Sequence, residues 1–420
     1  MMRGFKIRLL PNEEQEKFLF NIANGSRFVW NWALEYQINR FNNKQKIVQS
    51  NDLRKELIKY THTEDGKWLL DLPQKYLYEV FRDLYKAYTR FFKIQKEGIM
   101  FSKQTIIKRK RQNKSLTPYD MKGHPKFKKK KYAKLSFNSG NEATYFKINK
   151  NNELCVHIQK IGFIKIQTDF KLPIGRGKKT IYNPRVIYEN DKWTINFVLE
   201  CDNQAKPELK DYIIGIDLGI NSLAIATHCD QNNTQTKKFK NINKTNKVKK
   251  LKKRLKHFER KLSTCFVKNN SYESTKGTEK IRKKLNKIYK KLTCIRKNYI
   301  HHVTREIINN LPYAIVLEDL NIKGMMKNHH IAKALAEQML FKVRRQLEYK
   351  AENYGISVII APWNFPSSKK CSNCGNIKKD LKLGNSIYIC KQCGIKIDRD
   401  INAANNLEEY GKIMFNIHSL

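Results

Sequence analysis

Two sets of residues in this sequence have types and spacings that could do chemistry: three acids inside apolar segments and four cysteines in two pairs. The acids are Asp217 in the stretch IIGIDLG, Glu318 in AIVLED and Asp400 at the start of DINAANNL. A charge inside a buried strand costs free energy unless something pairs with it. Each of these acids therefore needs a partner that its apolar neighbours cannot supply.

The three acids are expected to face one common site. Strand alternation places Asp217 on the same face as Gly215, and Glu318 on the same face as Val316. Asp400 is expected to be the N-cap of the helix that follows it. Three carboxylates that converge from two strands and a helix start would bind a pair of divalent cations about 3.5–4 Å apart, which can activate water and stabilise the leaving oxygen of a phosphodiester. Mg²⁺ suits oxygen ligands of this kind.

Simpler roles for the same acids stay open at this point. Asp400 would then only cap a helix, and Glu318 would only pair with a lysine. Asp319 and Asp398 are rival metal ligands because they lie next to the favoured residues in the chain. Strand alternation disfavours Asp319, and Asp398 lies before the expected helix start.

The cysteines form two CxxCG knuckles, one on each side of residues 375–389. This spacing matches a four-cysteine tetrahedral zinc site. Redox chemistry is the alternative, but two matched knuckles favour a closed structural site. The sequence therefore predicts a small zinc ribbon that folds only with its metal and positions Asp400, which follows it. The four predicted ligands are Cys371, Cys374, Cys390 and Cys393.

The charge of the chain predicts a polyanionic partner. The sequence has 84 Lys and Arg residues against 38 Asp and Glu residues, which leaves a formal net charge of +46. A folded protein with this excess repels itself unless a polyanion such as nucleic acid neutralises it. A lysine bias without a partner is the alternative, but 11% aromatic and 40% hydrophobic residues argue against a disordered chain.

The first half of the chain reads as strands around a helical unit. Residues 4–10 alternate like a strand, and a helical pattern runs from Asn12 to about residue 100. Residues 103–134 hold many lysines among turn-forming residues, which predicts a segment that contacts phosphates. Residues 135–200 contain short alternating runs, which favours a β-barrel or sandwich that the strand at 4–10 joins.

The second half alternates buried strands with helices. A strand, a turn and a return strand begin at Asp211, and a basic helical hairpin covers residues 244–309. Residues 314–320 form another buried strand. One helix then runs from about Ile331 to Gly355, and residues 356–363 form the next strand.

The start of the sequence and its hydropathy predict a chain that works inside the cell. No apolar stretch is long enough to span a bilayer, and MMRGFKIRLLPNEEQ lacks the apolar core of a secretory signal. We expect a cytoplasmic protein, associated with the nucleoid if the host is a prokaryote. Thiols stay reduced there, so the five cysteines outside the knuckles are expected to be buried or inert.

The order of GIDLG, LEDLN, CSNCG, CKQCG and DRDINAANNL resembles the RuvC-like nuclease region of the TnpB family. This family comprises transposon-encoded RNA-guided nucleases related to type V CRISPR effectors. The upstream phrases RLLPNEEQ, FVWNWALE, GHPKFKKKK and LSF are also similar to it, so the resemblance covers most of the chain.

The resemblance implies a multidomain α+β chain. Its parts would be a β-barrel wedge domain (1–11 and 101–210), a helical recognition domain (12–100), an RNase H-like (RuvC) α/β nuclease domain (211–363 and 396–420) and an inserted zinc ribbon (364–395). It also implies that Asp217, Glu318 and Asp400 are the metal-binding acids. The wedge and recognition domains would hold a guide RNA and its paired target strand.

The function implied is an RNA-guided endonuclease of a mobile element, which cuts double-stranded target DNA beside a short motif that the protein reads. An RNA-guided repressor that does not cut and a guide-independent transposase are the alternatives. The presence of all three acids counts against the repressor. The phrase KNYIHHVTREI departs from the family, which usually has an arginine-aspartate-phenylalanine phrase there. His301 and His302 are expected to make packing or phosphate contacts rather than to bind metal.

Overall fold

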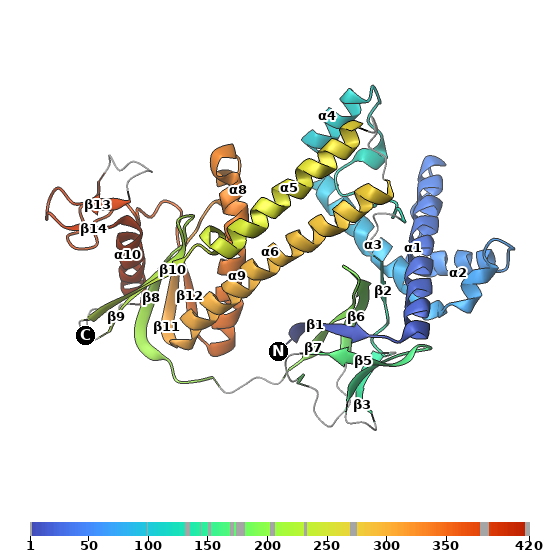
Figure 1. Cartoon of the computed structure of the whole chain (residues 1–420), viewed down its shortest axis with the longest axis horizontal. Helices are drawn as coiled ribbons and strands as arrows, with labels where there is room; N and C mark the ends of the chain where they lie inside the picture. The colour runs from blue at the N-terminus through green and yellow to red at the C-terminus, as the bar shows by residue number, and fades with distance from the viewer. Residues whose placement is uncertain are drawn as a thin grey trace. The chain divides into compact units, whose positions relative to one another are not determined.

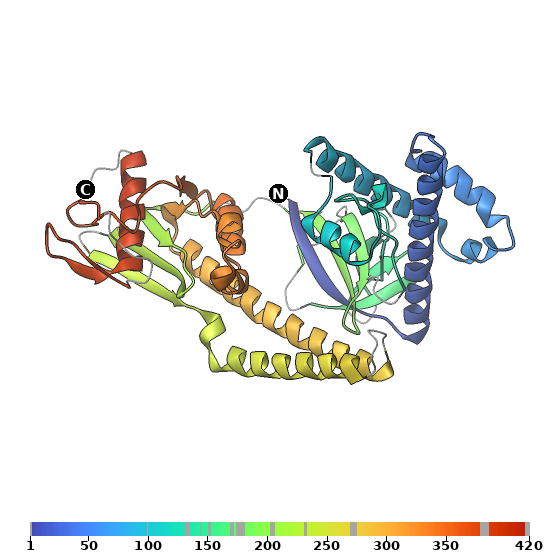
Figure 2. The same ribbon diagram turned by 90° about the horizontal axis from the view of Figure 1, so that it is seen from above.

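The chain folds into two compact units, residues 1–202 and 203–420, and each is described by itself (Figures 1 and 2). The structure is a computed structural model of the whole chain. It describes residues 2–98, 100–130, 135–142, 144–149, 153–168, 172–173, 181–201, 206–230, 233–268, 275–378 and 386–415.

The first unit contains the predicted helical region. Its longest helix, α1, begins after Asn12, as the sequence predicted. The Asn12 side chain accepts a hydrogen bond from the backbone N–H of Gln15 at 2.8 Å, and the Gln15 side chain accepts one from the N–H of Asn12 at 3.1 Å. This reciprocal pair satisfies two of the helix's free donors. The helices are α1 (Glu13–Asn42), α2 (Ser50–Thr61), α3 (Gln74–Lys96) and α4 (Lys103–Arg111).

One antiparallel sheet of seven strands completes this unit, in the order β2-β6-β7-β1-β5-β4-β3. The N-terminal strand β1 lies between β7 and β5, so the predicted strand at residues 4–10 does join the strands of residues 135–200. The strands are β1 (Met2–Leu10), β2 (Ser136–Asn138), β3 (Thr144–Ile148), β4 (Leu154–Ile158), β5 (Gly162–Gln167), β6 (Ile181–Tyr188) and β7 (Trp193–Glu200).

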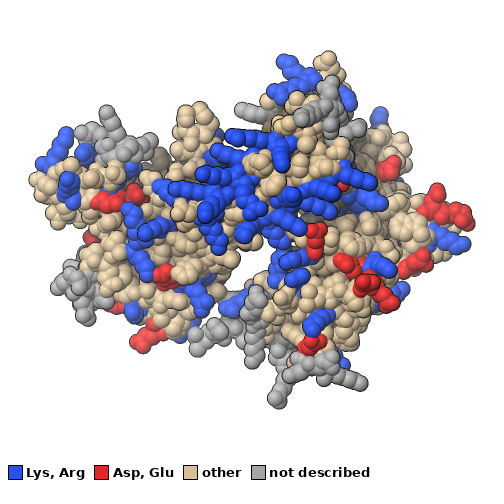
Figure 3. Space-filling model, viewed as in Figure 1, with Lys and Arg blue, Asp and Glu red and all other residues tan. Residues whose placement is uncertain are grey.

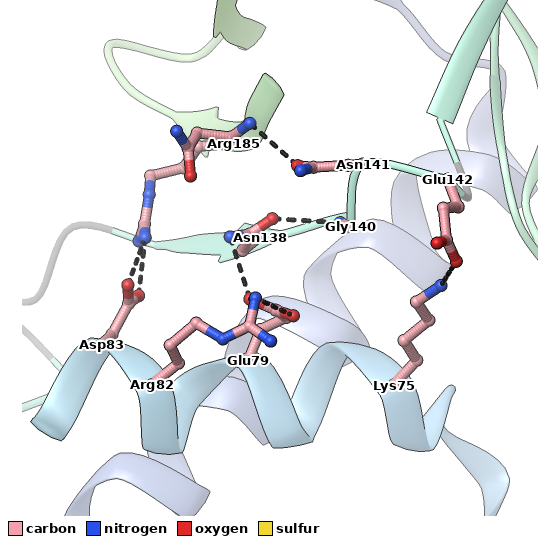
Figure 4. Close-up of polar contacts among 10 residues, drawn as sticks. Lys75, Glu79, Arg82, Asp83, Asn138, Gly140, Asn141, Glu142 and Arg185 are labelled. Carbon is pink, nitrogen blue, oxygen red and sulfur yellow. Dashed lines mark hydrogen bonds and ion pairs between the residues drawn. The ribbon is translucent and has the colours of Figure 1, made fainter. Parts of the chain in front are cut away.

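Polar contacts join α3 to the sheet (Figure 4). The guanidinium of Arg185 on β6 donates to both carboxylate oxygens of Asp83, at 2.8 and 2.6 Å. The Asn138 amide on β2 donates to Glu79 at 3.3 Å. Charge-assisted bonds to two neighbouring strands fix the register of the helix against the sheet.

The described part of the basic segment 103–134, residues 103–130, contains a helix as well as turns. Its start is α4, where the Ser102 hydroxyl accepts a hydrogen bond from the backbone N–H of Thr105 at 3.1 Å. Long basic side chains favour this helix because they lose little rotamer freedom in it. Further along, Asn31 of α1 exchanges two hydrogen bonds with the backbone of Lys128, so that stretch is held against a helix.

The second unit is built on a mixed sheet of five strands, in the order β10-β9-β8-β11-β12. The first three strands in sequence are antiparallel neighbours, and β11 and β12 then continue the sheet parallel to β8. The strands are β8 (Lys210–Asp217), β9 (Ser222–Asp230), β10 (Asn233–Lys240), β11 (Pro312–Glu318) and β12 (Ser357–Ala361).

Helix α10 (Arg399–Met414) covers one face of this sheet at very short range. A Cβ atom on Gly215 of β8 would lie 2.1 Å from the backbone oxygen of Ala404 and 2.4 Å from the backbone nitrogen of Glu408. Ala403 and Ala404 are buried at this contact. The small residues on both elements therefore let the two backbones approach closely.

The opposite face carries a larger apolar core under the helices α6 (Lys276–Asn309) and α9 (Leu340–Tyr354). The basic segment 244–309 is a hairpin of α5 (Asn246–Lys268) and α6, as predicted. Val248 and Leu251 pack against Ile288 and Leu292 along its seam. Lys and Arg side chains gather over both helices (Figure 3).

The single helix predicted from Ile331 to Gly355 is instead two helices, α8 (His329–Gln338) and α9, separated by Met339. Met339 has a φ of 57°, in the left-handed region. Its apolar side chain continues the periodic pattern, so the sequence pattern could not show the break. The short elements α7 (Ile322–Met325), β13 (Ile387–Ile389) and β14 (Lys396–Asp398) complete the unit.

Among the described residues, no helix combines the length and the apolar character that crossing a membrane requires.

The contact between α10 and β8 predicts a strong effect of one added methyl group. Gly215→Ala should lower the free energy of unfolding of the second unit by about 1–3 kcal/mol or more, because the methyl group meets backbone atoms that cannot rotate away. Urea unfolding measures this. Gly4→Ala is the control, since its Cβ would meet nothing within 4 Å, and it should change stability by less than about 0.5 kcal/mol. Equal effects of the two substitutions would contradict the close packing.

Candidate functional site

The structure brings the three predicted acids to one edge of the five-stranded sheet. Strands β8 and β11 are parallel neighbours, and Ile216 lies opposite Leu317. Asp217 and Glu318 therefore end adjacent strands side by side. Asp400 lies in the first turn of α10, which packs on β8 and β11. Residues 183 positions apart in the chain thus share one site.

The N-cap of α10 is Asp398 and not Asp400, which corrects the prediction. The Asp398 carboxylate accepts a hydrogen bond from the backbone N–H of Asp400 at 2.9 Å and also pairs with Lys238 at 3.0 Å. Asp398 thus satisfies a free donor of the helix. The two aspartates flank Arg399, so composition alone could not decide which one caps. Because Asp398 is the cap, the Asp400 carboxylate is not needed for that role.

Asp217 has the most perturbed ionisation of the three acids. It is partly accessible at the sheet edge, yet desolvation by the surrounding protein is the main reason that its pKa rises to about 8. The carboxylates of Asp400 and Glu318 raise the pKa further, whereas Arg399 lowers it. No hydrogen bond or ion pair within the described part of the chain engages the Asp217 carboxylate.

Burial also raises the pKa values of the other two acids. Ser367, which is buried, donates a hydrogen bond to Glu318 at 3.3 Å and lowers the pKa of that carboxyl. Arg399 lowers the pKa of both acids. No pattern in the sequence indicated a role for Ser367 or Arg399. Their proximity to a knuckle and to Asp400 was visible, but nothing in their types showed which way they point.

The donor set of this site fits hard divalent cations. It consists of carboxylate oxygens, which such cations prefer, and the carboxylates of Asp400 and Glu318 raise the pKa of Asp217 despite the opposing effect of Arg399. The carboxylate oxygens of the three acids lie farther apart than the ligands of a single ion would. Among the described residues, only the four cysteines have ligand atoms that close to one another. Ligands shared between two ions about 3.5–4 Å apart are necessarily more widely spaced.

The rival acid Asp319 points elsewhere. Its carboxylate pairs with Arg344 at 2.7 Å, and its side chain is half exposed. A cavity of about 390 Å³ lies next to Glu318 and Asp319, with Leu340 and Trp363 in its wall. The alternation of β11 thus directs Glu318 and Asp319 to different partners, as the sequence suggested.

The four cysteines form the second candidate metal site. Their sulfur atoms all lie within 4.8 Å of one another, so this cluster could bind zinc. The Sγ atoms of Cys371 and Cys393 are 3.6 Å apart, and those of Cys374 and Cys390 are 3.5 Å apart. A tetrahedral site with zinc–sulfur bonds of about 2.3 Å requires sulfurs about 3.8 Å apart. The spacing therefore fits a closed tetrahedral zinc site.

The two knuckles have matching backbone turns. The N–H of Gly375 donates to the carbonyl of Cys371 at 2.9 Å, and the N–H of Gly394 donates to that of Cys390 at 3.1 Å. Both glycines have positive φ values, 76° and 72°, which other residues rarely adopt. Backbone donors in the second knuckle lower the pKa of Cys390 to about 6. The glycine turns therefore let backbone amides approach the cysteine sulfurs.

Two buried asparagines tie the cysteine cluster to the helix of Asp400. Asn402 donates to the carbonyl of Lys370 at 2.7 Å and accepts from the N–H of Ser372 at 2.9 Å. Asn406 donates to the carbonyls of Ser367 and Lys370, both at 2.7 Å. Both lie on α10, so the knuckle and the acid share one support.

The two histidines do not join either site. His301 lies 3.1 Å from the amide nitrogen of Gln346, and burial lowers its pKa. His302 is exposed and pairs with Glu306 at 3.6 Å on the same helix. The packing contact predicted for this pair is present at His301.

Comparison with known protein families gives three matches. Residues 1–46 match a helix-turn-helix domain, residues 196–329 match a family described as a probable transposase (OrfB_IS605), and residues 341–407 match the Cas12f1-like TNB domain. The second match covers the strands that carry Asp217 and Glu318, and the third covers the four cysteines and Asp400.

Relatives of similar length are found in bacteria. A protein of Streptomyces pristinaespiralis, provisionally named an RNA-guided DNA endonuclease, is 24% identical over 96% of this chain and 88% of its own length. Escherichia coli InsQ, named in the same provisional way, is 24% identical over 97% of this chain and 91% of its own length. A shorter match is found in a virus: the TnpB-like protein L79 of Acanthamoeba polyphaga mimivirus is 29% identical over 34% of this chain and 28% of its own length.

A solved structure shares the fold. In the complex of Cas12f1 with its guide RNA and target DNA, the protein matches 97% of this chain and 98% of its own length, with a TM-score of 0.50 and 15% identity. At this identity the likeness concerns the fold alone.

The ionisation of Asp217 predicts a pH-dependent gain in stability on its replacement. Between its ordinary pKa and about 8, the folded chain holds a proton on Asp217 that the unfolded chain has released, so folding weakens by about 1.4 kcal/mol per pH unit. Asp217→Asn removes this loss. In buffer without Mg²⁺, the Tm of the variant should exceed that of the unsubstituted protein by an amount that grows by roughly 4 °C or more from about pH 5 to about pH 8. A pH-independent difference would mean that Asp217 ionises normally.

The cysteine cluster predicts bound zinc. We expect about one zinc ion per purified chain, and Cys374→Ser should remove most of it and expose residues near the knuckles to proteolysis, since a closed site needs all four ligands. Metal analysis by mass spectrometry and limited proteolysis measure both effects. Cys294→Ser is the control because this cysteine is exposed on α6, outside the cluster. Unchanged zinc in the Cys374 variant would refute the assignment.

Proposed function

We propose that this chain is a member of the TnpB family and an RNA-guided DNA endonuclease of a mobile element, which hydrolyses phosphodiester bonds of its target. The observation that carries the proposal is the meeting of Asp217, Glu318 and Asp400 at one sheet edge, with a four-cysteine cluster joined to the helix of the third acid. The relatives named above as RNA-guided DNA endonucleases support it over nearly the whole chain.

The second unit would be the nuclease part, with an RNase H-like (RuvC) fold. Its sheet supports this assignment, because three antiparallel strands are extended by two parallel ones and a helix crosses the acid-bearing face. The nuclease domain would comprise residues 211–363 and 396–420, with the zinc ribbon at 364–395. In the first unit, residues 1–11 and 101–210 would form the β-barrel wedge domain and residues 12–100 the recognition domain.

The acids would hold two Mg²⁺ ions. Two such ions activate the attacking water and stabilise the leaving oxygen of the phosphodiester. The chain's own contribution is to hold three carboxylates in place before the substrate arrives. Ser367 orients the Glu318 carboxylate, and Asp398 orients the first turn of α10 that carries Asp400. The four-cysteine cluster would hold a structural Zn²⁺ that keeps this end of α10 in place.

The partners would be a guide RNA from the mobile element and a double-stranded target DNA. The net charge of +46 and the lysine-covered α5–α6 hairpin suit phosphate backbones (Figure 3). Base pairing with the guide would read most of the target, and the protein itself would read a short motif beside it. The protein would act in the cytoplasm, on the nucleoid in a prokaryote.

Bound RNA separates this proposal from a guide-independent transposase. The protein should be expressed together with the DNA that flanks its gene, purified, and its bound RNA sequenced. One specific transcript supports a guided enzyme, whereas the absence of specific RNA supports the transposase. A plasmid library with a randomised motif beside the target, incubated with Mg²⁺, then tests cutting, which a guided repressor would not do.

A matched pair of neighbouring acids tests the assignment of the site. Glu318→Ala should lower the cleavage rate by at least about 10³-fold, equivalent to about 4 kcal/mol, because a metal ligand is lost. Asp319→Ala should leave cleavage within a few fold of the unsubstituted protein, since Asp319 pairs with Arg344. RNA binding by both variants, measured by filter binding, should be unchanged. If the two variants lose activity equally, the metal site does not lie where we place it.

A further inference from the structure

The loop that follows Asp217 is held by side chains from distant parts of the chain. After β8 ends, residues 218–221 turn back into β9. Within the loop, the N–H of Gly219 bonds the carbonyl of Leu223 only at 3.4 Å. The carbonyl of Ile220 instead accepts hydrogen bonds from the Asn241 amide at 2.8 Å and from the Gln338 amide at 3.0 Å. The loop therefore depends on external donors for its conformation.

Gln338 is the donor that spans the loop. Its amide nitrogen reaches the carbonyls of both Gly219, at 3.3 Å, and Ile220, at 3.0 Å. The side chain is only 2% exposed, at the end of α8. A buried amide that donates to two backbone carbonyls contributes strongly to local order, because removing it would leave both acceptors unsatisfied.

A second buried amide orients Gln338. The amide oxygen of Gln338 faces the amide nitrogen of Asn243 at 3.4 Å, and that nitrogen also donates to the carbonyl of Glu337 at 3.2 Å. Arg296 can only donate, and it contacts the oxygen of Asn243 at 2.7 Å, which settles the orientation of the Asn243 amide. The hydrogen bonds of Asn243 and Gln338 therefore leave each of these two side-chain amides one possible orientation.

The same contacts reach the base of the basic hairpin. Asn243 lies in the short 3-10 helix Ile242–Lys244, which comes just before α5, and Arg296 lies on α6. Glu337, next to Gln338, pairs with Arg296 at 3.4 Å and with Lys252 of α5 at 2.5 Å. The loop of Asp217 and the start of the hairpin are therefore held by one polar cluster.

The backbone at Gln338 is also unusual. The next residue, Met339, adopts a left-handed conformation, with φ at 57°, which costs a residue other than glycine roughly 1 kcal/mol or more. This residue ends α8 and begins α9. Because the helix breaks at Met339, Gln338 is the last residue of α8 and its side chain lies beside the loop.

We propose that Gln338 is a positioning residue for the metal site, whose amide holds the Gly219–Ile220 turn and thereby fixes the carboxylate of Asp217. This inference rests on the proposed function for the metal-binding role of the acids and for the identity of the reaction. Groups that orient metal ligands typically account for 10–100-fold in metal affinity or activity. A displacement of about 1 Å at a reacting group can cost about 100-fold in rate.

Gln338→Met tests the proposal, because methionine keeps the length of the side chain and removes both of its donors. Mn²⁺ binding to the purified protein, followed by electron paramagnetic resonance, should weaken by about 10-fold. Hydrogen exchange of the amides of residues 218–223 should speed up. The Mg²⁺ concentration for half-maximal DNA cleavage should rise by about 10-fold, with DNA binding unchanged.

Gln346→Met is the matched control. Gln346 is a glutamine on α9 with 3% exposure, and its amide contacts Thr304 and His301 on α6 rather than the loop. It should lower stability to a similar extent without weakening Mn²⁺ binding or speeding exchange in the loop. If both variants weaken Mn²⁺ binding equally, Gln338 has only a general structural role and the proposal is wrong.

Gln338→Glu is the second variant, for the case in which the methionine variant does not fold. Glutamate keeps an acceptor for Asn243 but cannot donate to the two carbonyls when ionised. It should shift Mn²⁺ binding in the same direction, and unchanged Mn²⁺ binding and loop exchange would overturn the proposal. If the unsubstituted protein binds Mn²⁺ but cuts no DNA, the proposed function fails while Mn²⁺ binding and exchange still decide the role of Gln338.

Discussion

The backbone contact between α10 and β8 is the interaction on which the site depends. A side chain at Gly215 would separate the helix from the sheet, because a Cβ there would lie 2.1 Å from a backbone oxygen of α10. Gly411 makes the reciprocal contact, since its Cβ would lie 2.6 Å from Val316 and 2.8 Å from Ile213. Glycines on both elements therefore set how far the Asp400 end of the helix lies from the strand ends.

This close packing places like charges in a poorly hydrated edge of the sheet. The pKa values of all three acids rise, first because of desolvation, and Asp217 rises to about 8. A fold selected for stability alone would replace these acids with neutral side chains. The chain tolerates the cost through the apolar core on the other face of the sheet. Added positive charge, which divalent cations would supply, would relieve this cost.

Neutral amides hold the two segments that carry acids. Asn402 and Asn406 join α10 to the first cysteine knuckle, while Asn241 and Gln338 hold the turn after Asp217. An amide fixes the direction of a backbone through two opposed hydrogen-bonding groups and adds no charge. Lysine or arginine at these positions would neutralise the carboxylates and compete with metal ions. These amide side chains therefore fix the position of the backbone without adding charge near the carboxylates.

The sequence by itself determined the features that depend on residue type and local spacing. The helix start at Asn12, the alternation that separates Glu318 from Asp319, the hairpin seam and the matched cysteine knuckles all follow from short-range periodicity, and each is present in the fold. The four-cysteine site was predictable as a whole because its ligands lie close in sequence and their chemistry is distinctive. Only the tertiary structure decided the cap of α10, the break at Met339 and the contacts of Ser367, Arg399 and Gln338. These depend on which way a side chain points and on what a distant segment offers it, and no local pattern in the sequence carries that information.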